Sequence, residues 1–195
     1  MRNASCRIVL VVALLVSPGL AAGETLSTLT LDALSYVSFQ NEEILAFPSG
    51  STIRFRFGDA SRTGIVPFTL GPDDVSIPPI SLPGGQTLTY DLALPANGSM
   101  ETTATGRRIS FNAMVSATLD GPNGGTFTYS IPFSTESASA TDASGSESVS
   151  VSGMRVVEGA LYVQIVGATV NRTNAFPKPG TAVYTVLSGE FDQVP

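Results

Sequence analysis

The sequence contains no histidine and no tryptophan, and Cys6 is the only cysteine among its 195 residues. Without histidine, the chain cannot form a Ser-His-acid triad, a Cys-His pair or the usual zinc and redox-metal sites. Without a second cysteine, it cannot form an intramolecular disulfide. We therefore expect that this protein is not an enzyme.

Positive charge is also scarce. The chain has ten Lys and Arg residues and 16 Asp and Glu residues, which gives a formal net charge of −6. Lys178 is the only lysine. Nucleic acids and anionic lipids are bound by basic clusters, and the sequence has none. We expect no nucleic-acid partner.

The longest apolar run lies at the N-terminus. Arg2 and Arg7 precede the apolar run Ile8–Val16, which is too short to span a bilayer. The small residues Ala21 and Ala22 follow this run and offer a cleavage site. This pattern predicts a signal peptide over residues 1–22, with cleavage after Ala21 or Ala22. The alternative is a retained anchor helix. We expect an exported protein, periplasmic, at the cell surface or extracellular, with no transmembrane segment in the mature chain. An exported chain without disulfides suggests a bacterial product.

The stretch Ile109–Phe133 is the clearest secondary-structure signal. Apolar residues occupy every second position in both of its arms, which is the period of a β-strand. Between the arms lie Asp120, three glycines, Pro122 and Asn123, which favour a turn. The sequence therefore predicts a β-hairpin with one buried face.

The rest of residues 23–195 shows the same alternation in shorter pieces, and no segment has a helical apolar stripe. Such strands, punctuated by Gly, Pro and Asn, are typical of all-β sandwiches. We predict a single antiparallel β-sandwich domain with two sheets and about 8–10 strands. The predicted strands outside the hairpin are residues 25–31, which continue as 35–39 in an extension or a second strand, and residues 43–47, 52–57, 64–70, 87–94, 149–156, 161–166 and 181–187.

Two segments interrupt the strand pattern. Residues 71–85 contain four prolines, which lack the amide that a central strand needs, so we expect them to run extended over the surface. Residues 134–148 have no apolar side chain larger than alanine, and such a tract buries too little surface to offset its ordering entropy. We predict a flexible Ser/Ala-rich loop there.

A candidate ligand-binding surface comes from polar aromatic residues that are out of phase with the core. Tyr162 and Gln164 alternate with apolar residues, and so does Tyr36. A tyrosine beside an amide on an exposed β-face can hold a sugar by stacking and hydrogen bonding. The other interpretation is that these are isolated surface tyrosines.

Calcium is the metal that the sequence allows, because it needs only oxygen ligands. The candidate ligands are Asp73 and Asp74 in the proline-rich segment, and Asp120 and Asn123 in the hairpin turn. No EF-hand loop is present, and both pairs are also common turn formers. Our prediction is no cofactor, with calcium as the possible exception.

These observations favour a non-catalytic exported β-sandwich protein that acts by binding or assembly. Its partner would be another protein, a second copy of itself, or an extracellular glycan. The proline-rich segment and the sheet edges are the expected contact surfaces. The alternatives are a carbohydrate-binding module and, less favoured, a glycoside hydrolase that uses two carboxylates.

Overall fold

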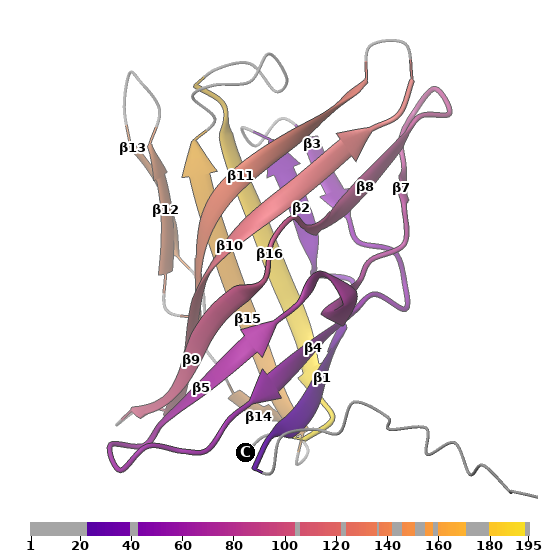
Figure 1. The fold of residues 1–195 in the computed structure, drawn as a ribbon. Coiled ribbons are helices and arrows are strands. Elements are labelled where there is room, and N and C mark those ends of the chain that lie inside the picture. Colours follow the sequence, from indigo (N-terminus) through magenta and orange to yellow (C-terminus); the bar gives the residue numbers. More distant parts are fainter. Residues whose placement is uncertain are drawn as a thin grey trace, which may run out of the picture.

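In the computed structural model, the protein is built almost entirely of β-strands (Figure 1). The structure describes residues 23–39, 43–103, 106–121, 124–135, 137–141, 146–150, 155–157, 160–170 and 180–193. The predicted signal peptide, residues 1–22, lies outside these ranges. In the described part, η1 (Pro72–Asp74) is a single helical turn, and no helix is both long enough and apolar enough to cross a membrane.

The strands cover most of the described chain. They are β1 (Thr25–Leu31), β2 (Tyr36–Phe39), β3 (Glu43–Ala46), β4 (Thr52–Phe57), β5 (Ile65–Leu70), β6 (Val75–Ser76), β7 (Ile80–Ser81), β8 (Thr87–Leu92), β9 (Ala96–Thr103), β10 (Gly106–Leu119), β11 (Gly125–Ser134), β12 (Ser137–Thr141), β13 (Ser146–Ser150), β14 (Arg155–Val157), β15 (Ala160–Val170) and β16 (Ala182–Phe191). The predicted all-β, antiparallel fold is confirmed.

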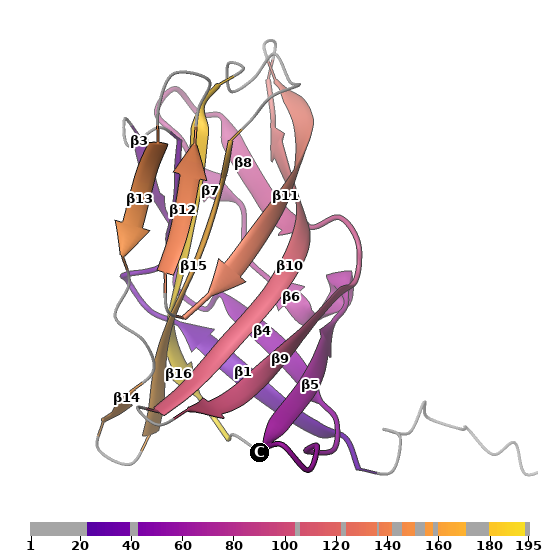
Figure 2. The same cartoon turned by 90° about the vertical axis from the view of Figure 1, so that its left-hand side faces the viewer.

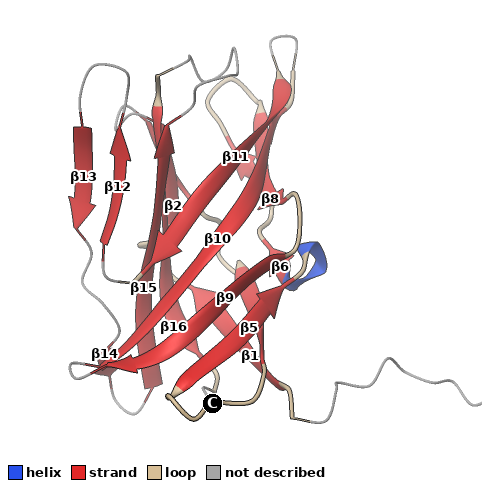
Figure 3. Cartoon of the chain, turned by 60° about the vertical axis from the view of Figure 1, so that its left-hand side comes forward, coloured by secondary structure: helices blue, strands red, loops and turns tan. Residues whose placement is uncertain are grey.

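Hydrogen bonds join these strands into one 14-stranded antiparallel sheet, apart from the separate pair β12–β13. The main path runs β14-β15-β11-β10-β9-β5-β4-β1-β16-β2-β3, and an additional β15–β16 pairing closes the sheet on itself (Figure 3). The predicted division into two sheets is therefore not confirmed. Alternation alone tells which residues face inward, but it does not tell whether the strands form one sheet or two.

The predicted hairpin is present as β10 and β11. Its register places Phe111 opposite Phe133 and Leu119 opposite Gly125, and the inward residues of both arms are buried. Gly121, with φ of 117°, supplies the positive φ at the start of the turn.

Two long strands connect the two ends of the molecule. Strand β10 pairs with β9 through Gly106–Asn112 and with β8 through Val115–Leu119. Strand β16 pairs with β1 near Phe191 and with β2 from Val183 to Val186. Because each long strand has different neighbours along its length, the sheet stays continuous while it bends around the core.

The core is dominated by aromatic rings at one end. Phe55 lies at the centre of this cluster, 5.0 Å from Phe68 and 5.2 Å from Phe191 between ring centroids. Both pairs are edge-to-face, the arrangement that adds about 0.5–1.5 kcal/mol to the area buried. Farther along, the Tyr90 hydroxyl of β8 lies 2.5 Å from Thr185 Oγ1 of β16, so a hydrogen bond links opposing walls across the interior.

Strands β12 and β13 form a hairpin that overlaps the segment predicted to be a flexible loop, residues 134–148, and ends two residues beyond it, at Ser150. Strand β12 lies against β15 and β16 on the outside of the closed sheet (Figure 2). The mobility of residues 134–148 stays a prediction.

Candidate functional site

The three predicted ligand residues share one face of the sheet. Directly opposite residues of an antiparallel pair point to the same side, and the register places Gln164 opposite Ser188 and Tyr36 opposite Val186. Tyr162 is two positions from Gln164 and lies opposite Glu190. The side chain of Tyr162 lies outside the described residues, so only its backbone position is known.

This outer face is not open over its whole extent. Its central residues are buried, although they point away from the main core: Val166, Ala168, Ala182, Tyr184 and Val186. Strand β12 lies over this side of β15 and β16. Gln164 and Tyr36, on opposite flanks of the buried centre, are half-buried. The structure therefore brings the predicted residues to one face without making that face a flat, exposed platform.

The exposed part of this face lies at the sheet edge. Strand β3 ends the sheet path, and within the described residues it pairs only with β2. Ile44, which lies opposite Ser38, is 65% exposed, and Ala46, opposite Tyr36, is also exposed. Leu45 between them is buried in the core. Among the described residues, strand β3 thus combines a backbone edge that has no partner strand with an outward apolar side chain.

Of the calcium candidates, Asp74 is held by arginine. Its side chain is 2% exposed, and it accepts two hydrogen bonds from Arg56, from Nε to Oδ2 at 2.9 Å and from Nη2 to Oδ1 at 2.7 Å. The backbone amide of Gly71 donates a third bond to Oδ2 at 2.8 Å. Burial by itself raises the pKa of this carboxyl, but the hydrogen bonds from Arg56 and Gly71 and the charges of Arg56 and Arg54 outweigh burial and lower the pKa.

Asp73 lies beside Asp74 but plays a different part. Its carbonyl oxygen accepts a 2.5 Å hydrogen bond from Arg54 Nη2, and the residue is exposed. Arg54 Nε is also 3.8 Å from Asp74 Oδ1. Two guanidinium groups therefore surround the Asp74 carboxylate. Because their positive charges already neutralise it, this arrangement disfavours the binding of a calcium ion there.

Asp120 joins the end of β10 to the start of β8. Its Oδ2 accepts a hydrogen bond from Thr87 Oγ1 at 2.6 Å, and its carbonyl accepts one from Gln86 Nε2 at 3.1 Å. Its predicted co-ligand, Asn123, lies outside the described residues. In the part of the chain that the structure describes, no three or more His, Cys, Asp or Glu residues come close enough to hold a metal ion. Calcium binding stays a prediction.

Sequence reasoning missed the roles of Arg54 and Arg56. Their alternation with buried residues on β4 correctly places them outside the core, where solvated charges are expected. The structure instead uses both to bind residues 73 and 74, which are 18 to 19 positions away. The sequence feature that could have indicated this pairing is the two arginines at alternate positions of β4, followed by two adjacent aspartates at positions 73 and 74.

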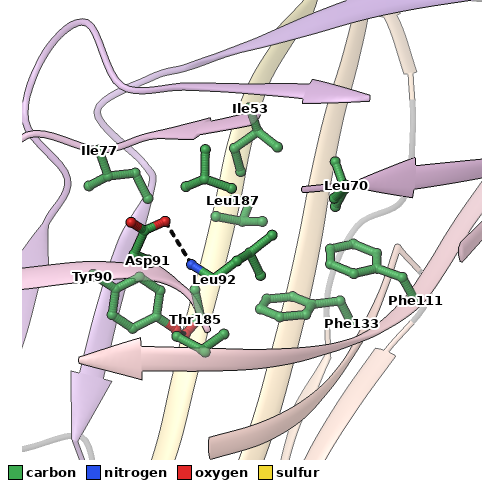
Figure 4. A pocket seen from close by; sticks show the side chains of 12 residues that line it. Ile53, Leu70, Ile77, Tyr90, Asp91, Leu92, Phe111, Phe133, Thr185 and Leu187 are labelled. Carbon is green, nitrogen blue, oxygen red and sulfur yellow. Dashed lines mark hydrogen bonds between the residues drawn. The ribbon is translucent and has the colours of Figure 1, made fainter. Parts of the chain in front are cut away.

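The interior contains one further candidate, a small cavity between β4, β8 and β16 (Figure 4). Its volume is about 30 Å³, which is room for roughly two water molecules. Most of its lining is apolar, from residues such as Leu92, Phe111 and Leu187, while Tyr90 and Thr185 contribute part of one wall. As it stands, this cavity is too small for an organic ligand.

Comparison of the chain with protein-family models, with curated proteins and with solved structures gave no match.

Proposed function

We propose that this protein is an exported, non-catalytic all-β protein that acts by binding or assembly, at the cell surface or in the periplasm. Export is supported by the signal-peptide pattern of residues 1–22. Binding would take place through the edge of the sheet.

The observation that carries this proposal is the edge strand β3. The backbone groups of an edge strand that face away from the sheet can pair with a strand from another chain. Proteins usually protect such edges with charges, prolines or covering loops. Here Ile44 is 65% exposed on the outer face of this strand. An exposed branched apolar residue on an edge that pairs with no other described strand favours association through added strand pairing.

Sedimentation velocity over a hundredfold concentration range tests the proposal. We expect the purified protein to show a mass that rises with concentration, and Ile44→Lys to remain monomeric because a lysine on this edge opposes strand pairing. Leu94→Lys is the matched control, since Leu94 is 56% exposed but lies in the bend between β8 and β9. Equal association by both variants would contradict the role of β3.

A carbohydrate-binding module is the second candidate, because the register brings Tyr36, Tyr162 and Gln164 to one face. Thermal melts against a glycan panel distinguish it, since a ligand that binds only the native state raises the midpoint. A rise that is lost in both Tyr36→Ala and Tyr162→Ala would favour this function. Parallel melts with calcium and with chelator test the calcium prediction, and we expect no shift because Asp74 and Asp120 are already engaged.

A further inference from the structure

The segment Gly71–Leu82, here called the strap, joins two edges of the sheet that do not pair with each other. Its β6 pairs with β4, where Thr52 lies opposite Ser76 and Ile53 lies opposite Val75. Its β7 pairs with β8, where Ile80 lies opposite Leu88 and Ser81 lies opposite Thr87. Between these anchors stand Pro78 and Pro79, which are exposed and have no amide hydrogen to donate. The strap therefore crosses from β4 to β8 with very few backbone hydrogen bonds.

The strap also covers the apolar interior. Val75 and Ile77 line the cavity on the strap side, facing Leu92, Phe111 and Leu187 from the sheet (Figure 4). Both strap residues are only partly buried, and both pack against the main core. If the strap moved outward, the space that it occupies would join the existing cavity. The result would be a mainly apolar pocket open to solvent, lined by aliphatic and aromatic side chains together with Asp91 and Thr185.

The firmest attachment of the strap is ionic. Asp74 receives the two-pronged hydrogen bond of Arg56, and Arg54 Nη2 donates to the carbonyl of Asp73. Charge-assisted, bidentate bonds of this kind are about twice as strong as neutral ones. The four residue pairs of β6 and β7, by contrast, belong to two-residue strands. The pair between Asp74 and Arg56 is thus the main polar contact that holds the first half of the strap, while Ile80, which is 5% exposed, anchors the second half in the core.

We propose that the strap is a latched cover over the apolar interior, that the Asp74–Arg56 pair is its latch, and that release of the latch admits a small apolar molecule. This inference does not depend on assembly through β3, which lies on a different edge of the sheet. Segments that open locally expose their amides without global unfolding. Release of the latch should therefore be visible at the strap alone.

Hydrogen exchange measured by mass spectrometry, together with binding of the neutral apolar dye N-phenyl-1-naphthylamine, tests the proposal. In Asp74→Asn we expect peptides covering residues 71–82 to exchange about tenfold faster or more, while peptides from β10 and β11 stay unchanged. Dye fluorescence should rise in the same variant. Glu101→Gln is the matched control, because it breaks the Arg108–Glu101 pair on β9 and β10. If Asp74→Asn does not fold, Arg56→Lys weakens the latch while keeping its charge.

A reversible lock separates strap opening from general loosening. Directly paired residues of an antiparallel ladder have Cα atoms about 4.5–5.5 Å apart, within the range of a disulfide. We would introduce Thr52→Cys and Ser76→Cys into Asp74→Asn, with Cys6→Ser to leave one cysteine pair. The oxidised protein should exclude the dye and protect the strap, and reduction should reverse both effects. Unchanged strap exchange in Asp74→Asn, or dye binding that persists in the oxidised lock, would overturn the proposal.

Discussion

At the scale of single residues, Tyr90 and Tyr129 are two buried tyrosines whose hydroxyl groups differ in hydrogen bonding. Burial raises the pKa of both phenols. Tyr90 hydrogen-bonds Thr185, whereas the Tyr129 hydroxyl has no hydrogen-bond partner among the described residues. A buried polar group without a partner costs free energy that an apolar replacement recovers.

We therefore expect opposite outcomes from the same chemical change at these two positions. Tyr90→Phe should lower the free energy of unfolding by about 1 kcal/mol, since it leaves Thr185 without its bond. Tyr129→Phe should leave stability unchanged or raise it. Urea unfolding measures both values. A loss in Tyr129→Phe as large as that in Tyr90→Phe would show that Tyr129 does have a partner in the folded protein.

Gly189 marks the closest approach of β1 to β16. A Cβ atom built on Gly189 would collide with the backbone carbonyl group of Thr30, and backbone cannot move aside as a flexible side chain can. Gly189→Ala should destabilise the protein by about 2 kcal/mol or more. Gly125→Ala is the control, because no atom lies within 4 Å of its Cβ position. Equal urea midpoints for the two variants would contradict the close approach.

At the scale of elements, the strap should respond to acid. The pKa of Asp74 is lowered in the folded protein, so its pair with Arg56 stabilises the fold above the unfolded carboxyl pKa of about 3.9. That stabilisation is lost as the pH falls through the lower, folded pKa. The Arg56 side chain is 37% exposed, and solvent screening reduces the value of the pair below that of a fully buried one.

Asp74→Asn should consequently lose about 1–2 kcal/mol of stability at pH 7, and the difference from the unaltered protein should shrink as the pH falls from the unfolded carboxyl pKa through the lower pKa of folded Asp74. Thermal melts of the two proteins across this range measure the difference. Subtraction matters because burial and the nearby Asp73 raise the pKa of Asp91, which gives both proteins a separate pH dependence. A difference that does not change with pH would show that shape, and not charge, explains the loss.

At the scale of the whole molecule, the closed sheet makes stability depend on distant parts of the chain. Strand β16 pairs with β1, β2 and β15, so the first and last described strands lie side by side. The Thr28 amide also donates to Asp192 Oδ1 at 2.8 Å. Few of these contacts can form before the chain is nearly complete.

A chain that ends after Gly180 should therefore fail to fold, because the loss of β16 removes neighbours from three strands and opens the core. A chain that ends after Gln193 is the control and should fold normally. Circular dichroism and the dispersion of amide signals in proton NMR distinguish the two. A folded product from the shorter chain would show that the closing pair β15–β16 is dispensable.

Much of the local structure was predictable because alternation is a local property. The period of two in Ile109–Phe133 predicts both the strands and their inward faces, and the structure confirms both. The turn residues near Asp120 likewise mark where the hairpin reverses. Alternation also predicts that Tyr36 and Gln164 are out of phase with the core, and the register places both positions on the outer face; their role in ligand binding stays a prediction.

The remaining features arise from contacts between distant segments. Nothing near Val166 or Val186 indicates that their outer face is covered by β12, since that depends on where the hairpin lies in space. Likewise, the alternation along β4 places Arg54 and Arg56 on the outer face, but it does not show that they bind Asp73 and Asp74 and not solvent. That depends on the path of the strap.

The sequence by itself determined that this chain forms β-strands, which residues of each strand face inward, and that the chain has no histidine and a single cysteine. Those properties follow from residue type and spacing alone. Only the tertiary structure decided that the strands form one closed sheet, that β3 is left as an edge, and that Asp74 anchors the strap. These depend on which strands become neighbours, and that choice is made by the packing of the whole core.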